Sequence, residues 1–282
     1  METFEQPSEL QSFLQRELRQ KKSIGFVPTM GSLHSGHISL INKSKSENDI
    51  TIVSIYVNPF QFNDEKDFLN YPVDLDEDIR LLKKINCDVL FIPNTKDMYK
   101  DGFDLINLDL GNLDTILEAK ERPGHFKGVI FIVNKLFKII APNRAYFGEK
   151  DYQQLLIIKK LGGRYFKEIS IRGCPTIRDQ DGLAMSSRNK KLSKQQLNIA
   201  KKVFNLLQST EQVIKKDGIQ KAKISVNDFF CQNEQINLEY FEIIDEKNFS
   251  LINKANKDKR YRLMIAFKIG NVRLIDNLKL KQ

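Results

Sequence analysis

The chain has 282 residues, of which 41% are hydrophobic and 29% are charged. This length suggests about two domains of ~150 residues each, and the composition excludes an intrinsically disordered chain. The 45 Lys and Arg residues exceed the 36 Asp and Glu residues, and the resulting net charge of +9 keeps nucleic acid and anionic membrane surfaces among the partners to be weighed. Histidine occurs only at His34, His37 and His125. So few histidines exclude most arrangements of a metal site.

Three scattered cysteines, Cys87, Cys174 and Cys231, form no Cys-x-x-Cys pair, as expected of buried thiols in a reducing compartment. The N-terminal segment is acidic and amphipathic and lacks an apolar signal-peptide core. No window reaches the ~18 apolar residues of a membrane span. We therefore predict a cytoplasmic protein without a membrane partner.

Helical and strand patterns alternate through the first 173 residues, which predicts parallel βαβ units in a doubly wound α/β sheet. In such a sheet ligands bind beyond the carboxyl ends of the strands, here the loops after Met30, Val57 and Phe147. The predicted elements are a helix with Ser8 as its N-cap, a strand over 23–30, a helix from His37, a strand over 49–59 that stops at Asn58-Pro59, a helix from Asp76, a strand over 89–92, a buried helix over 128–141, a short strand over 145–148 and a helix over 151–163 closed by its two glycines.

The pattern changes after Gly173. A long amphipathic helix opened by Ser193 is followed by a helix over 222–234. Strands over 237–245 and 260–277 come next, the second folded at a Gly270-Asn271 hairpin turn. We predict a Rossmann-like nucleotide-binding domain over residues 1–173 and a smaller α+β lid domain with antiparallel strands over 174–282.

The strongest local signal is the segment 28–37, Pro-Thr-Met-Gly-Ser-Leu-His-Ser-Gly-His, where a predicted strand gives way to a helix. Gly31 and Gly36 allow a ligand close to the backbone, and a helix N-terminus offers N–H groups and a positive dipole to phosphate. The His-x-Gly-His pattern of His34 and His37 resembles the signature of a nucleotidyltransferase superfamily in which these histidines contact ATP phosphates. The alternative is a glycine-punctuated turn with two surface histidines. It is disfavoured because two of the three histidines fall at the predicted phosphate site.

Two further segments carry polar groups. Asn58 and Gln61 in the segment 57–62 are amides of the kind that hold hydroxyls and a carboxylate in a small pocket, although this motif alone would more simply be a turn capped by Asn58. The acidic stretch 74–78 is most simply a helix start that complements the helix dipole. Its alternative interpretation is that Asp78 helps to place Mg²⁺ on a nucleotide.

Two polar blocks lie further along the chain. After a short strand, Lys150 offers an ammonium to phosphate and Asp151 a carboxylate to ribose or metal. The alternative is that the charged run Glu149-Lys150-Asp151 is simply solvated, as such surface runs normally are. Residues 178–189 put hydroxyls and a guanidinium on a glycine-bearing loop at the domain junction. That is the chemistry of a phosphate clamp on a flexible, movable element.

These blocks closely resemble the pantothenate synthetases, a family of ligases that join pantoate to β-alanine. The resemblance covers residues 23–193 and rests on PTMGSLHSGH, VNPFQF, RPGHFKGV, FGEKDYQQL and DGLAMSSRN, which occur in the family's order and spacing. The C-terminal third has the length and pattern of the family's small domain but little motif support of its own.

The resemblance implies an ATP-dependent reaction through pantoyl adenylate that releases AMP and pyrophosphate, with Mg²⁺, no tightly bound organic cofactor, no nucleic-acid partner and a homodimer. It implies that His37 is an acid toward a phosphate oxygen or the departing pyrophosphate, that His34 assists, and that Lys150 and Arg188 are further catalytic groups. The implied ATP-binding residues are Met30, Gly31, Ser32, Leu33, His34, Ser35, Gly36, His37, Gly148, Glu149, Lys150, Asp151, Ile177, Met185, Ser186, Ser187 and Arg188. The implied pantoate-binding residues are Gln61, Gln154, Asn58 and Met30, with Gln61 also near β-alanine and Asp78 near Mg²⁺.

Some positions depart from the family pattern. Val73 stands where Arg is common, Asn143 where Asp is usual, and the pair 130–131 is bulkier than expected. None of these departures removes a proposed catalytic group. Val73 leaves open how the loop before Asp78 is anchored.

The charge is unevenly distributed along the chain. Residues 1–173 carry 24 basic and 24 acidic side chains, whereas residues 174–282 carry 21 and 12, so the whole excess of +9 lies in the second predicted domain. This distribution suits steering of ATP better than a general nucleic-acid surface. The alternative functions are a nucleotidyltransferase of the same superfamily that releases a nucleotidylated product, and a basic nucleic-acid-binding protein.

Overall fold

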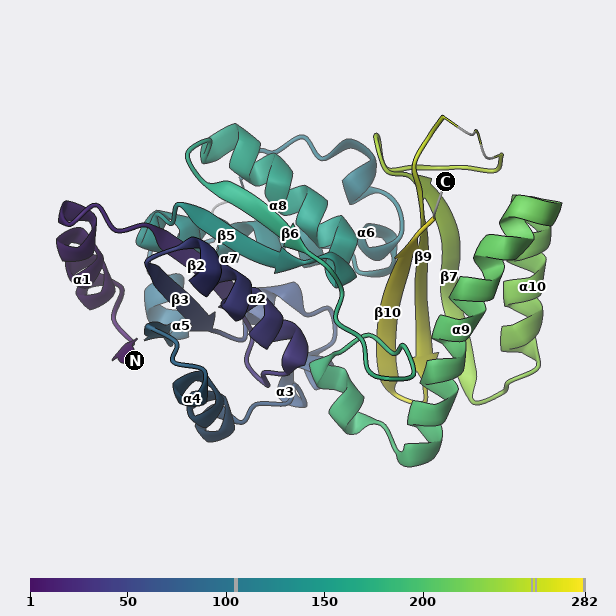
Figure 1. Ribbon diagram of the computed structural model, residues 1–282, viewed down its shortest axis with the longest axis horizontal. Coiled ribbons are helices and arrows are strands. Elements are labelled where there is room, and N and C mark those ends of the chain that lie inside the picture. The colour runs from purple at the N-terminus through teal and green to yellow at the C-terminus, as the bar shows by residue number, and fades with distance from the viewer. Residues whose placement is uncertain (104–105, 255, 257, 281–282) are drawn as a thin grey trace. The chain divides into compact units, whose positions relative to one another are not determined.

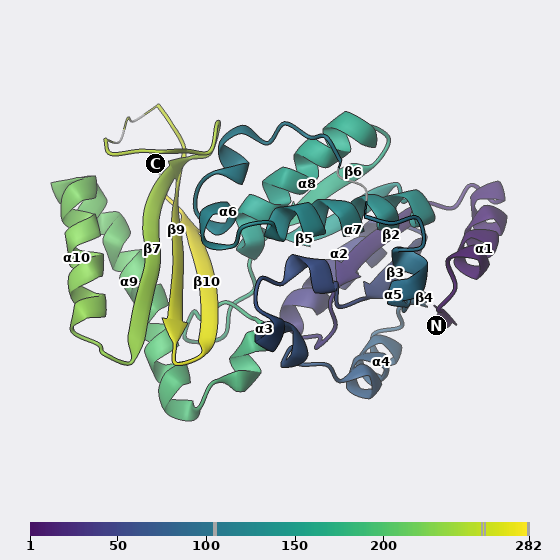
Figure 2. The same cartoon turned by 180° about the vertical axis from the view of Figure 1, so that it is seen from behind.

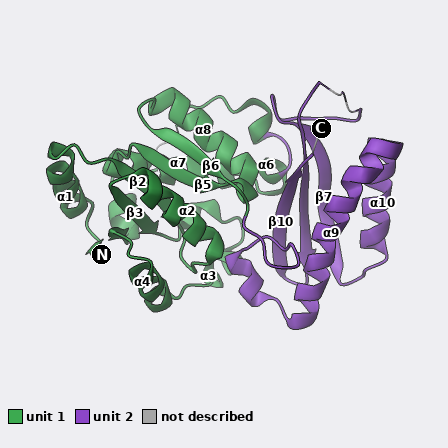
Figure 3. Ribbon diagram, in the orientation of Figure 1, with its two compact units in different colours: residues 1–114, 118–176 green, residues 115–117, 177–282 purple. Residues whose placement is uncertain are grey.

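The computed structural model describes residues 1–103, 106–254, 256 and 258–280. They divide into two compact units, shown in green and purple in Figure 3. The first unit comprises residues 1–114 and 118–176, and the second comprises 115–117 and 177–282. The division after Thr176 lies three residues beyond the predicted boundary at Gly173.

The first unit contains a six-stranded sheet of order β1-β4-β3-β2-β5-β6, in which every neighbouring pair is parallel. The order reverses at β2, which lies between β3 and β5, so the predicted doubly wound sheet is confirmed. The strands are β1 (Glu2–Phe4), β2 (Ile24–Thr29), β3 (Ile50–Ile55), β4 (Val89–Phe91), β5 (Arg144–Gly148) and β6 (Ser170–Cys174).

Helices cover both faces of this sheet, with α2 in front of it in Figure 1 and α7 in front of it in Figure 2. On the α2 face, Leu40 and the α4 residue Leu82 pack against Val53. On the opposite face, the rings of Phe26 and Phe137 meet with centroids 6.4 Å apart. The helices are α1 (Pro7–Arg19), α2 (Ser35–Glu47), α3 (Glu65–Leu69), α4 (Leu75–Lys84), α5 (Thr95–Met98), α6 (Glu118–Glu121), α7 (His125–Ile140) and α8 (Tyr152–Tyr165), with 3-10 turns η1 (Pro59–Gln61), η2 (Gly111–Asp114) and η3 (Glu149–Asp151).

The bounds of several predicted helices differ from those in the structure, and two of these differences have a clear physical reason. Helix α1 begins at Pro7, because proline fits the first turn of a helix, and Gln6 occupies the N-cap expected of Ser8. Helix α8 continues past its two glycines to Tyr165. A Cβ on Gly162 would lie 3.0 Å from Ile171 of β6, so this glycine permits close packing of the helix on the sheet rather than ending the helix.

The second unit contains an antiparallel sheet of order β10-β9-β7-β8. Ile269 pairs with Val272 across the two-residue turn, so the predicted hairpin is confirmed. The predicted cap of the long helix is also confirmed, because the Ser193 side chain accepts from the Gln196 N–H. The elements are β7 (Ile236–Asp245), β8 (Ser250–Leu251), β9 (Tyr261–Ile269), β10 (Val272–Lys279), α9 (Lys194–Asp217), α10 (Ile219–Cys231) and η4 (Ser187–Lys191).

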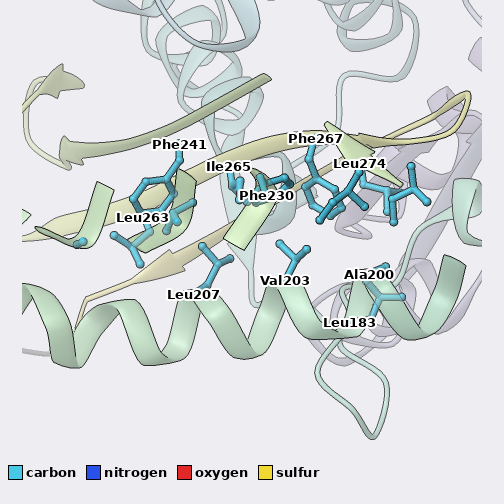
Figure 4. Close-up of a cluster of buried hydrophobic side chains, with 14 of the residues drawn as sticks. Leu183, Ala200, Val203, Leu207, Phe230, Phe241, Leu263, Ile265, Phe267 and Leu274 are labelled. Carbon is cyan, nitrogen blue, oxygen red and sulfur yellow. The ribbon is translucent and has the colours of Figure 1, made fainter. Parts of the chain in front are cut away.

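A hydrophobic core joins the helices of the second unit to its sheet. Figure 4 shows Val203 and Leu207 of α9 beneath Leu263, Ile265 and Phe267, all of them buried. The long helix therefore owes its place to an apolar stripe at helical spacing. Among the described residues, no helix has the length and apolar composition needed to cross a membrane.

The structure accommodates the departures from the expected family pattern. Asn143 accepts the Ile24 N–H on its side chain at 2.6 Å and donates its own N–H to the Ile24 carbonyl at 2.8 Å, so it secures the start of β2. Phe131 stacks against Tyr99, with ring centroids 4.8 Å apart. Val73 is exposed.

Candidate active site

The three predicted loops lie side by side at the carboxyl ends of the parallel strands, because β3, β2 and β5 are neighbours in the sheet. Contacts connect them. The Gln61 side-chain amide, beyond β3, donates to the Met30 sulfur beyond β2. The charge of Lys150, beyond β5, acts on the His37 ring. The structure therefore brings Met30, His37, Gln61 and Lys150 into one region of the first unit.

The turn after β2 has an unusual backbone. Gly31 and Ser32 have φ angles of 80° and 50°, and a left-handed residue other than glycine costs about 1–3 kcal/mol unless surrounding contacts hold it. Here the contacts come from Asp78, whose Oδ2 and Oδ1 accept the N–H groups of Ser32 and Leu33, each at 2.7 Å. The Gly31 N–H is bonded to the Thr29 hydroxyl at 3.2 Å.

The two motif histidines form a mutual cap at the start of α2. The His34 Nδ1 accepts the Gly36 N–H at 3.1 Å, and the His37 Nδ1 accepts the His34 N–H at 3.4 Å. The two ring centroids are 4.0 Å apart. A backbone amide only donates, so both Nδ1 atoms are unprotonated, and each neutral ring carries its proton on Nε2. The pair therefore presents two Nε2–H donors.

Burial is the main cause that lowers the pKa of His37 to about 3, and the neighbouring His34 and Lys150 lower the pKa further. His37 is thus neutral near pH 7, a state that donates a hydrogen bond but does not fit the predicted role as an acid. At the predicted phosphate site, several backbone N–H groups are already engaged. The N–H groups of residues 31–34 and of Gly36 already have acceptors within the protein.

Asn58 is committed to contacts within the protein. Its side chain is 1% exposed, its Nδ2 donates to the Gly128 carbonyl at 3.0 Å and to the Gln61 Oε1 at 3.4 Å, and its Oδ1 accepts from the Tyr99 hydroxyl. These contacts favour a role for Asn58 in positioning Gln61 over the predicted direct contact with a ligand.

Arg122 and His125 hold the backbone of the segment 57–62 at Gln61. The motifs did not predict this role. The Gln61 carbonyl lies 2.6 Å from the His125 Nδ1 and accepts from Arg122 Nη2 at 3.2 Å. A carbonyl only accepts, so His125 carries its proton on Nδ1, and its Nε2 can accept from Arg122 Nη1 at 3.1 Å. The sequence signal that could have predicted this role is the Arg-Pro-Gly-His-Phe motif, which contains both residues.

Gly128 completes the support of Gln61. A Cβ at Gly128 would lie 2.4 Å from the Phe60 carbonyl oxygen and 2.8 Å from the Gln61 nitrogen. Both are backbone atoms, so only glycine lets α7 approach η1 this closely. The RPGHFKGV motif thus acts on the site through the position of Gln61.

The two consecutive glutamines that follow the loop after β5 differ in their surroundings. Gln153 is buried, accepts the Glu118 N–H at 3.1 Å and donates to the Leu113 carbonyl at 2.9 Å, so it is structural. Gln154 is partly exposed and remains a candidate ligand group. Lys150 lies 3.8 Å from the Asp151 carboxylate, and its side chain is 19% exposed.

The remaining predicted nucleotide-site residues, Ile177 and Met185 to Arg188, belong to the second unit. The Met185 N–H donates to the Ile177 carbonyl at 2.9 Å, and the Arg188 N–H donates to the Ser186 hydroxyl at 3.3 Å. Ser187 is buried.

The start of this block is anchored, contrary to the predicted flexible loop. Arg178 makes two hydrogen bonds to the Asp276 carboxylate, at 2.6 and 2.9 Å. Its guanidinium carbon lies 4.1 Å from the centre of the Phe204 ring. A paired and stacked guanidinium fixes the hairpin from residue 178 to residue 184 on the sheet of the second unit.

The geometry favours a supporting role for Asp78 over the predicted contact with magnesium, since each of its oxygens accepts a backbone N–H group. The described part of the chain also holds no cluster of three His, Cys, Asp or Glu side chains arranged to bind a metal ion. Asp78 is instead part of the support of the turn after β2.

Comparisons with known proteins show which family the chain resembles. Residues 2–279 match the family described as pantoate-beta-alanine ligase. A pantothenate synthetase of Cytophaga hutchinsonii is 42% identical over 272 residues, 96% of each chain. One of a Sulfurihydrogenibium species is 42% identical over 284 residues, covering 99% of this chain and 100% of the relative.

Solved structures show the same likeness. Pantothenate synthetase from Thermus thermophilus has a TM-score of 0.90 and 35% identity over 100% of both chains. The Francisella tularensis pantoate-beta-alanine ligase, solved with beta-gamma ATP and beta-alanine, has a TM-score of 0.82 and 40% identity over 100% of this chain and 98% of its own. The chain therefore belongs to the pantoate–β-alanine ligase family, and it is an ATP-dependent ligase that condenses pantoate with β-alanine.

Proposed function

We propose that this ligase forms pantothenate in two steps through pantoyl adenylate, with AMP and pyrophosphate as the other products. A carboxylate is a poor electrophile because an amine cannot expel oxide from it, whereas adenylation supplies AMP as a leaving group. The observation that carries the proposal is the pair of neutral histidines beside Lys150 at the edge of the sheet, within the same unit as the Gln61 amide. These are donors for a polyphosphate next to donors for a carboxylate and hydroxyls.

In the first step a pantoate carboxylate oxygen attacks the α-phosphorus of ATP, and the bond to pyrophosphate breaks. We assign the Nε2–H groups of His34 and His37 and the Lys150 ammonium to the negative charge that develops on the phosphate oxygens. His37 acts here as a neutral donor, because its pKa is lowered to about 3. Pyrophosphate leaves as an anion, with no proton required from His37.

In the second step the β-alanine amine attacks the acyl carbon, the acyl–phosphate bond breaks, AMP leaves and the amine loses a proton. We assign pantoate to Gln61, Gln154 and Met30, with Gln61 also near β-alanine. The support for Gln61 is its fixed backbone and its amide at Met30. Asn58 holds Gln61 in place.

We assign the rest of the first unit's part of the ATP site to the loops after β2 and β5, residues 30–37 and 148–151. For the second unit we keep the assignments that the family resemblance implies, namely Ile177 to adenine through its backbone, and Met185, Ser186, Ser187 and Arg188 to the phosphates. The excess charge of +9 lies wholly within residues 177–282, which favours attraction of a polyanion. Mg²⁺ would enter with the ATP phosphates and neutralise part of their charge.

Two measurements test the reaction. With ATP, Mg²⁺, pantoate and β-alanine, AMP should form only when both organic substrates are present, and AMP formation without pantoate would contradict the proposal. Pantoate-dependent ATP–pyrophosphate exchange isolates the first step. It should be lost in His37→Ala while the protein stays folded, and normal exchange in that variant would remove His37 from the mechanism.

Gln61→Ala should weaken binding of pantoate more than binding of ATP in calorimetric titrations. Equal losses for the two ligands would reject the assignment of Gln61 to pantoate.

We further propose a homodimer formed through the first unit. Phe60 is 53% exposed, and its ring contacts those of Tyr99 and Phe103 with centroids 4.7 and 5.1 Å away. Leu69 is 71% exposed. An interface that covered these side chains would remove apolar surface from water. Light scattering should give twice the 32.8 kDa chain mass, and a monomer at micromolar concentration would refute the dimer.

A cytoplasmic location also remains a prediction. The three cysteines, all within the described part of the chain, are free thiols, as a reducing compartment allows.

A further inference from the structure

Asp78 differs from the other acidic residues at the start of α4. Asp76 and Glu77 in the same turn are exposed, whereas Asp78 is 2% exposed. An exposed acid at this position suffices to complement the helix dipole. The burial of Asp78 therefore needs another explanation, which its contacts provide.

Those contacts join α4 to the turn after β2, 45 and 46 residues away in the chain. One carboxylate oxygen accepts from Ser32 and the other from Leu33, both at 2.7 Å. Two successive N–H groups converge in this way only because Gly31 and Ser32 adopt positive φ angles. A carboxylate offers an acceptor to each N–H group, whereas an isosteric amide would place an NH₂ donor against one of them.

The turn leads directly into the histidine pair. Leu33 is followed by His34, whose N–H is bonded to the His37 ring and whose own ring caps Gly36. A shift of the turn would therefore move both imidazoles together. We propose that Asp78 is a positioning residue of the adenylation site, because its carboxylate fixes the turn 31–33 and thereby the two Nε2–H donors. The inference rests on the proposed use of this pair for adenylation.

The competing role is that of a magnesium ligand, and the two roles predict different results for Asp78→Asn. A magnesium ligand that loses its charge should raise the Mg²⁺ concentration needed for activity, and excess Mg²⁺ or Mn²⁺ should restore the rate. A positioning residue should lower kcat at every metal concentration. The matched control is Asp76→Asn, which removes the same charge from the same helical turn at an exposed position.

The assay is pantoate-dependent ATP–pyrophosphate exchange, with kcat and the KM for ATP measured across a Mg²⁺ titration. We expect Asp78→Asn to lower kcat roughly 100-fold, the usual consequence of misplacing reacting groups by about 1 Å, with the KM for ATP changed less than threefold. Asp76→Asn should match the wild type. A normal kcat in a folded Asp78→Asn, or recovery of its kcat at high Mg²⁺, would overturn the inference.

A spectroscopic arm tests the contact without relying on activity. Nuclear magnetic resonance of ¹⁵N-labelled protein should show the Ser32 and Leu33 amide protons far downfield in the wild type, with at least one shifted upfield in Asp78→Asn. Unchanged shifts would refute the contact. If wild-type exchange itself fails while the shifts behave as expected, the proposed function is wrong and the contact stands.

A second variant covers the case in which Asp78→Asn does not fold. Asp78→Glu keeps the charge and both acceptor oxygens but adds a methylene in a buried site. We expect it to lower kcat without changing the Mg²⁺ requirement. Full activity in Asp78→Glu would favour a metal ligand, which tolerates the longer side chain, and would reject the positioning role.

Discussion

Gly128→Ala offers the sharpest test of how the site is supported. The added methyl group would lie 2.4 Å from the Phe60 carbonyl oxygen and 2.6 Å from its carbon, whereas ordinary contact between such atoms begins near ~3.5 Å. The obstacle is backbone, so η1 and α7 must separate by on the order of 1 Å. Gln61 lies within η1 and must move with it.

The effect on stability should be small because two terms oppose each other. Overpacking costs about 1–3 kcal/mol, and replacing a helical glycine with alanine returns about 1 kcal/mol. The net loss of about 1 kcal/mol corresponds to a fall in Tm of roughly 2–4 °C. The effect on catalysis should be large, since a displacement of about 1 Å costs on the order of 100-fold. It should appear in kcat/KM for pantoate rather than in ATP binding.

Gly163→Ala is the matched control. Gly163 is also helical, in α8, but no atom lies within 4 Å of a Cβ built there. This variant should gain about 0.5–1 kcal/mol of stability and keep wild-type kinetics. The assays are thermal unfolding and steady-state kinetics with pantoate varied. A Gly128→Ala enzyme with wild-type kcat/KM for pantoate would refute the claim that close helix approach positions Gln61.

Three further predictions concern stability. Arg178→Lys keeps the charge but loses the two-pronged bond to Asp276 and the stacking on Phe204, and should cost about 1–3 kcal/mol in urea unfolding; an unchanged midpoint would show that the pair contributes little. Gly182→Ala places a Cβ 2.0 Å from the same ring at a φ of +90° and should cost about 2–5 kcal/mol, so a stable variant would reject the packing argument. The pKa of His37 is lowered from 6.5 to about 3, so between these pH values the unfolded chain binds more protons than the folded one. The free energy of unfolding should therefore fall as pH falls from about 6.5 toward 3. In His37→Gln the free energy of unfolding should depend less steeply on pH. Parallel pH profiles of the two proteins would contradict the lowered pKa.

Local patterns predicted most of the elements because each leaves a signal within a few residues. The Ser193 cap, the Gly270 turn and the helix through Val129 and Phe137 all follow from such spacing. Strands β1 and β6 were not predicted. Both lie at the edges of the sheet and are largely exposed, so they lack the apolar run that marks a buried strand.

For this protein the sequence alone determined the family, the parallel fold and the loops that carry the site, because those depend on motifs and periodicity along the chain. The tertiary structure decided what individual side chains do there. Asp78, taken from sequence as a possible metal ligand, supports a turn 45 residues upstream of it, and Asn58, bonded to the Gly128 carbonyl 70 residues away, holds Gln61. Hydrogen bonds of long sequence separation fix these roles, and the chemical character of a carboxylate or an amide does not reveal which partner the fold will bring to it.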